Sequence, residues 1–264
     1  MLVEKISAKG RGAPVAVAPP KIRYHLPDSV RGLTLISMAV YHAVWDMVYL
    51  FDEGWSWYVS PAAFWWQQSI CWTFILLSGF CFPMSRRSLR RGVILLAASA
   101  AVTAVTVLFS PESRIFFGVL CLMGSAMVLL TPLKGALRRF PPALGAAVSF
   151  LLFLLTRWVD TGAVTFLGRR LLTLPAALYA NGFTAWLGFP PPEFYSADYF
   201  PLLPWLFLYL TGIFLHYLFH RGGRTEWLSG CSCPPLEWLG RHSLLLYLVH
   251  QPVIYGALWV LYEL

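Results

Sequence analysis

The length, composition and charge of the chain exclude an ordinary soluble domain. Of its 264 residues, 58% are apolar and 12% are charged, and the formal net charge is +8. Soluble domains carry about 25% charged residues, so this chain has too little polar surface to cover a soluble globule of its size. We therefore predict an integral membrane protein, and we expect no nucleic-acid partner.

The N-terminal segment, residues 1–22, is basic and lacks an apolar core. It combines Lys5, Lys9, Arg11 and Lys21 with prolines and small residues, a composition that does not fit a cleavable signal peptide. We expect a disordered basic arm, either a solvated tail or a segment attracted to anionic lipid. The remainder, residues 23–264, is expected to form a single transmembrane domain.

Apolar runs predict an all-α, polytopic helix bundle with about seven spans. A spanning helix needs about 20 mostly apolar residues. Such runs occur at 32–51, 63–83, 92–110, 115–132, 142–158, 200–219 and 243–262. The segment 171–188 is also apolar, but Pro175, Asn181 and Gly182 interrupt it. We expect this segment to be re-entrant or interfacial, with an eighth span as the alternative.

The placement of Lys and Arg predicts the orientation of the bundle. With seven spans, sixteen of the twenty basic residues fall on the side of the N-terminus. An eighth span would move Arg221, Arg224 and Arg241 to the other side. We therefore expect a cytoplasmic N-terminus and an extracytoplasmic C-terminus.

The five cysteines predict neither a disulfide framework nor a metal site. Cys71, Cys81 and Cys121 lie in apolar runs, where a free cysteine usually acts as a small hydrophobic residue. Cys231 and Cys233 form an isolated Cys-Ser-Cys, without the paired spacing of a zinc site. We expect no metal.

An imidazole and a carboxylate lie one turn apart in the first predicted span. His42 and Asp46 occupy positions i and i+4, which share a helix face. A carboxylate beside an imidazole orients it and raises its basicity, as a general base requires. Because ionisable groups are costly in hydrocarbon, we expect the pair to serve catalysis or substrate binding. The alternative is an interhelical hydrogen-bond pair that fixes packing.

Further polar residues lie in or beside the last and sixth spans. Tyr247, His250 and Gln251 precede Pro252, and a proline inside a span is tolerated where neighbouring groups satisfy the freed backbone. His250 is interpreted as a second acid or base, an acceptor-binding residue or a packing residue. Asp198 is expected to cap the N-terminus of the sixth span or to border an acceptor pocket.

Polar side chains also mark the two ends of the second span. Gln67 and Gln68 lie near its outer end, where at least one of them should face the bundle interior. The arginines 86, 87, 90 and 91 follow its inner end. Guanidinium groups pair well with phosphate oxygens, so this cluster either binds a polyphosphate or only sets the topology.

Four stretches together carry a resemblance to a known family. They are the Asp-x-x-Arg-Gly start at Asp28 followed by His42, the Ser-Gly pattern at 74–80, the segment 198–205, and the segment 239–252. These stretches resemble the heparan-α-glucosaminide N-acetyltransferase catalytic-domain family, a branch of the transmembrane acyltransferases, over about residues 23–260. The chain is similar to a bacterial member, which implies a bacterial cytoplasmic membrane.

The resemblance implies an activity and a set of partners. An acyl group, typically acetyl, would pass from cytosolic acyl-CoA to an extracytoplasmic acceptor, with His42 as general base. The expected partners are acetyl-CoA, a saccharide hydroxyl or amine, and membrane lipid, and a homodimer is compatible with the pattern. The expected donor-binding residues are Arg31, Ser78, Arg86, Arg87 and Arg90; those at the acceptor are Gln67, Asp198, Tyr247, His250 and Gln251.

Two other functions remain open from the residues alone. A proton-coupled transporter would use His42, Asp46 and His250 as a relay. Transporters often contain internal repeats, and we find none in this sequence. A non-catalytic scaffold is the third hypothesis, for which buried ionisable residues would be a costly choice.

Overall fold

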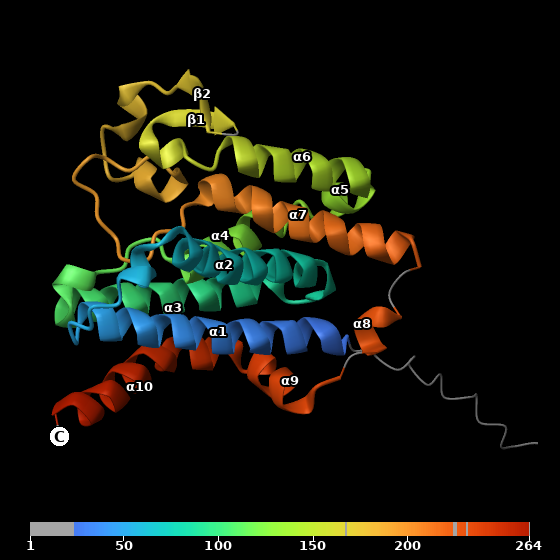
Figure 1. The fold of residues 1–264 in the computed structure, drawn as a ribbon. Helices are drawn as coiled ribbons and strands as arrows, with labels where there is room; N and C mark the ends of the chain where they lie inside the picture. The colour runs from blue at the N-terminus through green and yellow to red at the C-terminus, as the bar shows by residue number, and fades with distance from the viewer. Residues whose placement is uncertain (1–23, 167, 224–225, 231, 264) are drawn as a thin grey trace, which may run out of the picture.

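A computed structural model describes residues 24–166, 168–223, 226–230 and 232–263. The predicted basic arm, residues 1–22, lies outside the described residues. Within them the chain is mainly helical, as the sequence predicts, and the long helices run roughly side by side (Figure 1).

Each of the seven predicted apolar segments contains a helix. These are α1 (His25–Tyr49), α2 (Pro61–Cys81), α3 (Ser88–Phe109), α4 (Val119–Leu130), α6 (Pro142–Leu155), α7 (Leu202–Arg221) and α10 (Ser243–Glu263). Shorter helices are α5 (Lys134–Arg139), α8 (Trp227–Gly230) and α9 (Pro234–Arg241). The 3₁₀ turns are η1 (Ser56–Val59), η2 (Phe82–Met84), η3 (Pro111–Ser113), η4 (Val159–Thr161), η5 (Ala176–Tyr179) and η6 (Thr184–Leu187).

Four helical segments of the described chain are long and apolar enough to cross a membrane. They are Ser88–Phe109, Pro142–Thr161, Leu202–Arg221 and Ser243–Tyr262. Helix α4 has only 12 residues. Helices α1 and α2 have 25 and 21 residues, but their polar side chains lower their hydropathy. Helices α1 and α2, which contain His42, Asp46 and Gln67, are therefore not among these four.

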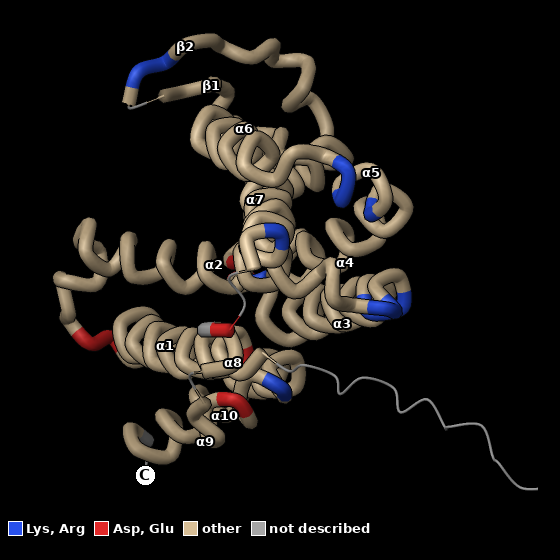
Figure 2. Tube along the Cα trace, turned by 90° about the vertical axis from the view of Figure 1, so that its right-hand side faces the viewer, with Lys and Arg blue, Asp and Glu red and all other residues tan. Residues whose placement is uncertain are grey.

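Basic side chains gather at one end of the bundle, where α2 and α7 end and α3 and α6 begin. Figure 2 looks onto this end, with blue segments on α3, α5 and α7. We call it the basic end and define it by Arg86, Arg87, Arg90, Arg138, Arg139 and Arg221. The predicted orientation of the bundle rests on this gathering of basic residues at one end.

The expectation of an all-α fold is wrong in one place. Strands β1 (Ala163–Phe166) and β2 (Arg169–Thr173) form an antiparallel hairpin beyond the C-terminal end of α6. Gly162 and Gly168 adopt positive φ angles of 82° and 77°, which glycine reaches without steric cost. The rest of the segment 171–188 forms η5 and η6 instead of a long helix. These elements include no helix long enough to cross a membrane, so the segment 171–188 does not form the alternative eighth span.

The core forms where α2 and α6 pack on α7. Ile75, Phe153 and Tyr209 are fully buried there. Two glycines allow the backbones of α2 and α7 to touch: a Cβ built on Gly79 would lie 2.0 Å from the Tyr209 carbonyl oxygen. A Cβ on Gly212 would lie 2.2 Å from the carbonyl oxygen of Leu76. Side-chain dispersion and close backbone approach therefore hold this crossing together.

Candidate active site

Polar side chains of α1 and α10 meet inside the bundle. The rings of His42 and His250 lie 4.9 Å apart between centroids, at an interplanar angle of 61°. One turn further along, the amide nitrogen Nε2 of Gln251 donates to Oδ1 of Asp46 over 2.6 Å. The packing of α10 on α1 thus joins the two polar positions of the first predicted span to two of the last.

The partner of the Asp46 carboxylate differs from the one that the sequence suggests. Among the described residues, the hydrogen bond to this carboxylate comes from Gln251, and none joins it to His42. Asp46 is 0% exposed, and its second oxygen, Oδ2, is buried without a partner. The i, i+4 spacing puts both groups on one side of α1, but the amide donor for the carboxylate belongs to α10.

The hydrogen bond of His250 fixes its neutral tautomer. Nδ1 lies 2.6 Å from the carbonyl oxygen of Tyr247. A carbonyl oxygen can only accept, so Nδ1 carries the proton and Nε2 of the neutral ring carries the lone pair. Nε2 of His250 is buried without a hydrogen-bond partner, and so is Oε1 of Gln251.

Asp198 joins α4 and α10 at the same site. Its Oδ2 accepts hydrogen bonds from the Val119 backbone N–H at 3.3 Å and from the Tyr247 hydroxyl at 3.4 Å. The expectation that Asp198 caps the sixth span is wrong. Val119 is the first residue of α4, whereas Pro201 precedes α7 and makes no side-chain cap. The carboxylate does bond the N-terminus of a helix, but that helix is α4, which is distant in the sequence, and not α7.

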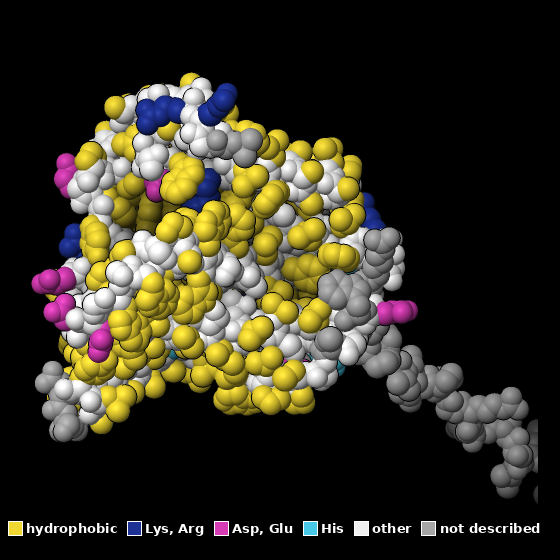
Figure 3. All heavy atoms as spheres, viewed as in Figure 1, with side chains coloured by type: hydrophobic (Ala, Val, Ile, Leu, Met, Phe, Trp, Pro, Cys, Tyr) yellow, Lys and Arg dark blue, Asp and Glu magenta, His cyan; other side chains and the backbone are white. Residues whose placement is uncertain are grey.

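A cavity of about 220 Å³ opens at the end opposite the basic end. Its wall includes Gln67, Arg157, Asp160, Asp198 and Trp205. Figure 3 shows a recess in this region, below the β-hairpin. One guanidinium nitrogen of Arg157 donates to the Gln68 side chain, and the guanidinium lies 4.7 Å from the centre of the Trp205 ring. Arg157 keeps further N–H donors for a ligand because guanidinium has five.

An aromatic cavity adjoins the first one. It has a volume of about 270 Å³ and is walled by Tyr41, Trp45, Tyr49 and Tyr58 among others. Phe64 and Gln67 line both cavities. Tyr41 precedes His42 in α1, and their ring centroids are 6.0 Å apart. Both cavities therefore lie towards the end of the bundle opposite the basic end, and Tyr41 connects the second one to His42.

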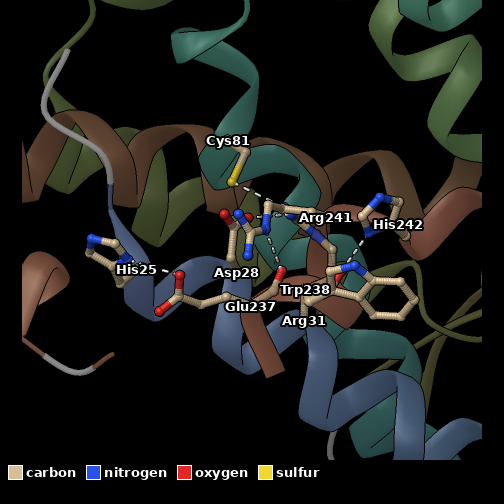
Figure 4. A network of polar contacts seen from close by, with 8 residues as sticks. All are labelled: His25, Asp28, Arg31, Cys81, Glu237, Trp238, Arg241 and His242. Carbon is tan, nitrogen blue, oxygen red and sulfur yellow. Dashed lines mark hydrogen bonds and ion pairs between the residues drawn. The ribbon is translucent and has the colours of Figure 1, made fainter. Parts of the chain in front are cut away.

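At the other end, Arg31 is held in a polar network (Figure 4). Its guanidinium donates to Asp28 at 3.1 Å and to the Cys81 sulfur at 3.2 Å. The Asp-x-x-Arg spacing therefore forms an i, i+3 ion pair at the start of α1. A Cβ on the adjacent Gly32 would lie 2.0 Å from the Leu236 carbonyl oxygen. Arg31 is thus positioned where α1 and α9 touch.

Helix α9 is attached to the start of α1 by a second ion pair in Figure 4. Oε2 of Glu237 lies 2.9 Å from Nδ1 of His25, and Oε1 accepts from Ser232 at 2.6 Å. These two hydrogen bonds, Ser232 first, hold the pKa of Glu237 below its ordinary value. A Cβ on Gly240 would lie 2.0 Å from the Asp28 carbonyl oxygen. The first and last sequence motifs therefore pack directly on each other.

The remaining predicted donor-binding residues are not assembled into one pocket. Arg86, Arg87 and Arg90 are exposed at the basic end. Ser78 precedes Gly79, at the crossing of α2 and α7. The Ser-Gly pattern thus has a packing role in the structure. Within the described part of the chain, no three His, Cys, Asp or Glu side chains come together as a metal site.

Arg157 is the site residue that sequence reasoning missed. The sequence places it only among the four basic residues of the outer side. The feature of the sequence that could have identified Arg157 is its position at the end of an apolar run, beside Trp158. A guanidinium stacks well on aromatic rings. Of Gln67 and Gln68, at least one is expected to face inward, and Gln68 is 6% exposed.

The arrangement defines a helical membrane protein with a polar site inside its bundle. Comparison with protein families then identifies the chain. Residues 23–252 match the family described as heparan-alpha-glucosaminide N-acetyltransferase, catalytic, and the chain belongs to this family. The resemblance seen in the sequence is confirmed, and the family makes the chain a member of a group of membrane acetyltransferases. No curated protein and no solved structure gives a significant match.

Proposed function

We propose that the protein transfers an acetyl group from cytosolic acetyl-CoA to an acceptor on the extracytoplasmic side, with His42 as general base. The family supports acetyl transfer. The observation that carries the site assignment is the meeting of His42 and His250 beside the buried Asp46–Gln251 pair. Buried polar groups without partners cost about 1–3 kcal/mol each, and such a cost is typical of a site built for a ligand.

The proposed topology has seven spans, with the basic end in the cytoplasm. The four apolar helices and the gathering of arginines at one end support it. Reporter fusions after residues 86, 138 and 170 test it. Cytoplasmic signals from the first two and an extracytoplasmic signal from the third are expected. A cytoplasmic signal at residue 170 would contradict the proposed topology.

The donor is proposed to enter from the basic end. Arg31 and His42 are 11 residues apart in one helix, which corresponds to about 16 Å along its axis. The pantetheine arm of CoA can roughly cover this length. Its phosphates would then lie near Arg86 and Arg90, while the thioester reaches the histidines.

Turnover of acetyl-CoA by the purified protein tests the role of His42. With an extract of cell-envelope saccharides as acceptor, His42→Gln is expected to lose about 100-fold or more of the rate, since a general base contributes at least that much. His242→Gln is the matched control, because His242 is exposed and also bonds a backbone carbonyl through Nδ1. Wild-type turnover in His42→Gln would exclude it as the base.

Binding of CoA tests the arginine cluster. The double change of Arg86 and Arg90 to Ala is expected to weaken CoA affinity without loss of folded protein, because guanidinium–phosphate pairs are removed. The same double change at Arg169 and Arg170 is the matched control, because these residues lie on the hairpin, which is away from the basic end (Figure 1). Equal CoA affinity in the two double variants would contradict the phosphate role.

A further inference from the structure

Arg157 has no counter-ion among the described residues. No carboxylate of this part of the chain forms an ion pair with it, although Asp160 and Asp198 line the same cavity. The guanidinium lies 4.7 Å from the centre of the Trp205 ring and 5.1 Å from that of Trp158. Such rings hold the group in place without using its N–H donors, which lie in the guanidinium plane. A partly buried charge without a partner favours an anion supplied from outside the chain.

A chain of hydrogen bonds fixes which polar atoms beside Arg157 remain available. Oε1 of Gln68 accepts from the Arg157 guanidinium and, at 3.1 Å, from Nε1 of Trp72. Both of these groups can only donate, so the amide of Gln68 has a single possible orientation. Its Nε2 therefore donates to Oε1 of Gln67, at 2.8 Å. Nε2 of Gln67 keeps two N–H donors and makes no hydrogen bond to the described part of the chain.

The available groups on these two side chains are thus all donors. Arg157 keeps the N–H groups that Gln68 does not take, and both Arg157 and Gln67 line the cavity of about 220 Å³. Ionised carboxylate and phosphate oxygens only accept hydrogen bonds, and they pair with a guanidinium through two parallel bonds. A neutral hydroxyl can use one donor but gains nothing from the charge. This part of the cavity therefore selects an oxyanion.

The two carboxylates of the cavity suit other groups of the same ligand. Oδ2 of Asp198 is already engaged by the Val119 N–H and the Tyr247 hydroxyl. Asp160 is exposed, so solvent and salt screen its charge. Both carboxylates can accept hydrogen bonds from hydroxyl groups. The lining therefore fits a ligand that carries hydroxyl groups beside its anionic group.

The cavity is connected to the two histidines through its own lining. Gln67 also lines the aromatic cavity, whose wall contains the residue that precedes His42. In addition, Asp198 accepts from the hydroxyl of Tyr247, and the carbonyl of the same tyrosine holds Nδ1 of His250. A ligand anchored in the cavity can therefore extend towards both histidines.

We propose that Arg157 and Gln67 form an oxyanion-binding subsite, which holds a carboxylate or phosphate group of the acceptor. This inference rests on the proposed acetyl transfer. It makes Arg157 a specificity-determining residue, because acceptors that carry a negative charge bind more tightly than neutral ones. Transfer itself takes place at the histidines, so the anionic group and the reacting group of the acceptor are held at different points.

Three sugars of similar size test the subsite. They are methyl glucoside, which is neutral, the corresponding methyl glucuronide, which carries a carboxylate, and the corresponding sugar phosphate. Equilibrium dialysis without acetyl-CoA measures the affinity of the purified protein for each. The wild type should bind at least one charged sugar about 10-fold or more tightly than the neutral one, since hydrogen bonds to charged groups are worth that much. A preference for only one of them supports the subsite and identifies its anion.

Two variants and a control locate the preference. Arg157→Gln should abolish it, because the charge and the paired donors are removed. Gln67→Glu should also abolish it, because the new carboxylate still accepts from Gln68 but offers no donor. Arg114→Gln is the matched control: Arg114 also lies over an aromatic ring, 5.5 Å from the centre of Tyr195, but it does not line the cavity. The preference is a ratio of affinities within one variant, so it does not depend on how much of the protein is folded.

Equal affinity of the wild type for all three sugars would overturn the proposal. A preference that Arg157→Gln retains would also overturn it, and so would an equal loss in Arg114→Gln. If Arg157→Gln yields no folded protein, a preference retained by Gln67→Glu overturns the proposal. Acetyl-CoA turnover with an envelope extract, combined with equal sugar affinities, contradicts the subsite alone. A preference for charged sugars without turnover on any acceptor contradicts the proposed acetyl transfer and supports the anion site.

Discussion

Replacement of Gly79 by alanine tests the assignment of the Ser-Gly pattern to helix packing. The new Cβ would lie 2.0 Å from the Tyr209 carbonyl oxygen, whereas ordinary contact begins at 3.4 Å. Helices α2 and α7 would have to separate by about 1.4 Å, and overpacking of this kind costs about 1–3 kcal/mol. The loss falls in the core around Ile75 and Tyr209, which α2 and α7 share.

Gly256→Ala is the matched control, because Gly256 lies within α10 and a Cβ added there would meet no atom within 4 Å. Alanine favours a helix by up to about 1 kcal/mol over glycine, so this variant should be as stable as the wild type or more so. Unfolding in mixed detergent micelles measures both variants. The packing assignment is refuted if Gly79→Ala keeps wild-type stability and instead raises the KM for acetyl-CoA per folded molecule.

Three further changes test single contacts. Gln251→Leu removes the hydrogen bond to the Asp46 carboxylate, and hydrogen bonds to charged groups are worth about 1.5–3 kcal/mol. The free energy of unfolding should fall by that amount, and an unchanged unfolding curve would contradict the contact between Gln251 and Asp46. Asp198→Ala should destabilise the start of α4 by about 1 kcal/mol, seen as faster hydrogen exchange at Val119, and unchanged exchange would argue against the cap. The contacts of Glu237 lower its pKa, so its carboxylate should stabilise the fold above the ordinary carboxyl pKa, and this stabilisation should be lost as pH falls through the lowered pKa. Glu237→Gln should remove this part of the pH dependence of unfolding. An identical pH dependence in the variant and the wild type would contradict the stabilising role of Glu237.

The helices could be predicted from the sequence because their apolar runs match the length of a span. The residues of the site could also be named, since ionisable groups in apolar runs are costly and few. Their partners could not be predicted. The spacing of His42 and Asp46 is a local property of α1, whereas the Gln251 contact depends on where α10 packs. The same holds for Asp198, whose carboxylate caps a helix 79 residues away in the chain.

The hairpin and the outer cavity are harder to foresee. The short strands around Gly162 and Gly168 lie within a region that is apolar on average, so hydropathy averaged over a window does not distinguish them from a helix. Arg157 resembles a loop charge in the sequence because its aromatic neighbour Trp205 comes from a distant segment. The glycines of the motifs carry no visible role in the sequence, and only the backbone contacts of Gly32, Gly79 and Gly240 reveal their packing function.

The most direct test of the central claim is acetyl transfer across a bilayer by the purified protein. In proteoliposomes with labelled acetyl-CoA on the side of the basic end and an extract of cell-envelope saccharides on the other, labelled acetylated product should appear only on the saccharide side. Its formation should require His42 and should release CoA in equal amount. Proton-driven flux without acetyl-CoA consumption, or equal product formation by His42→Gln, would contradict the account.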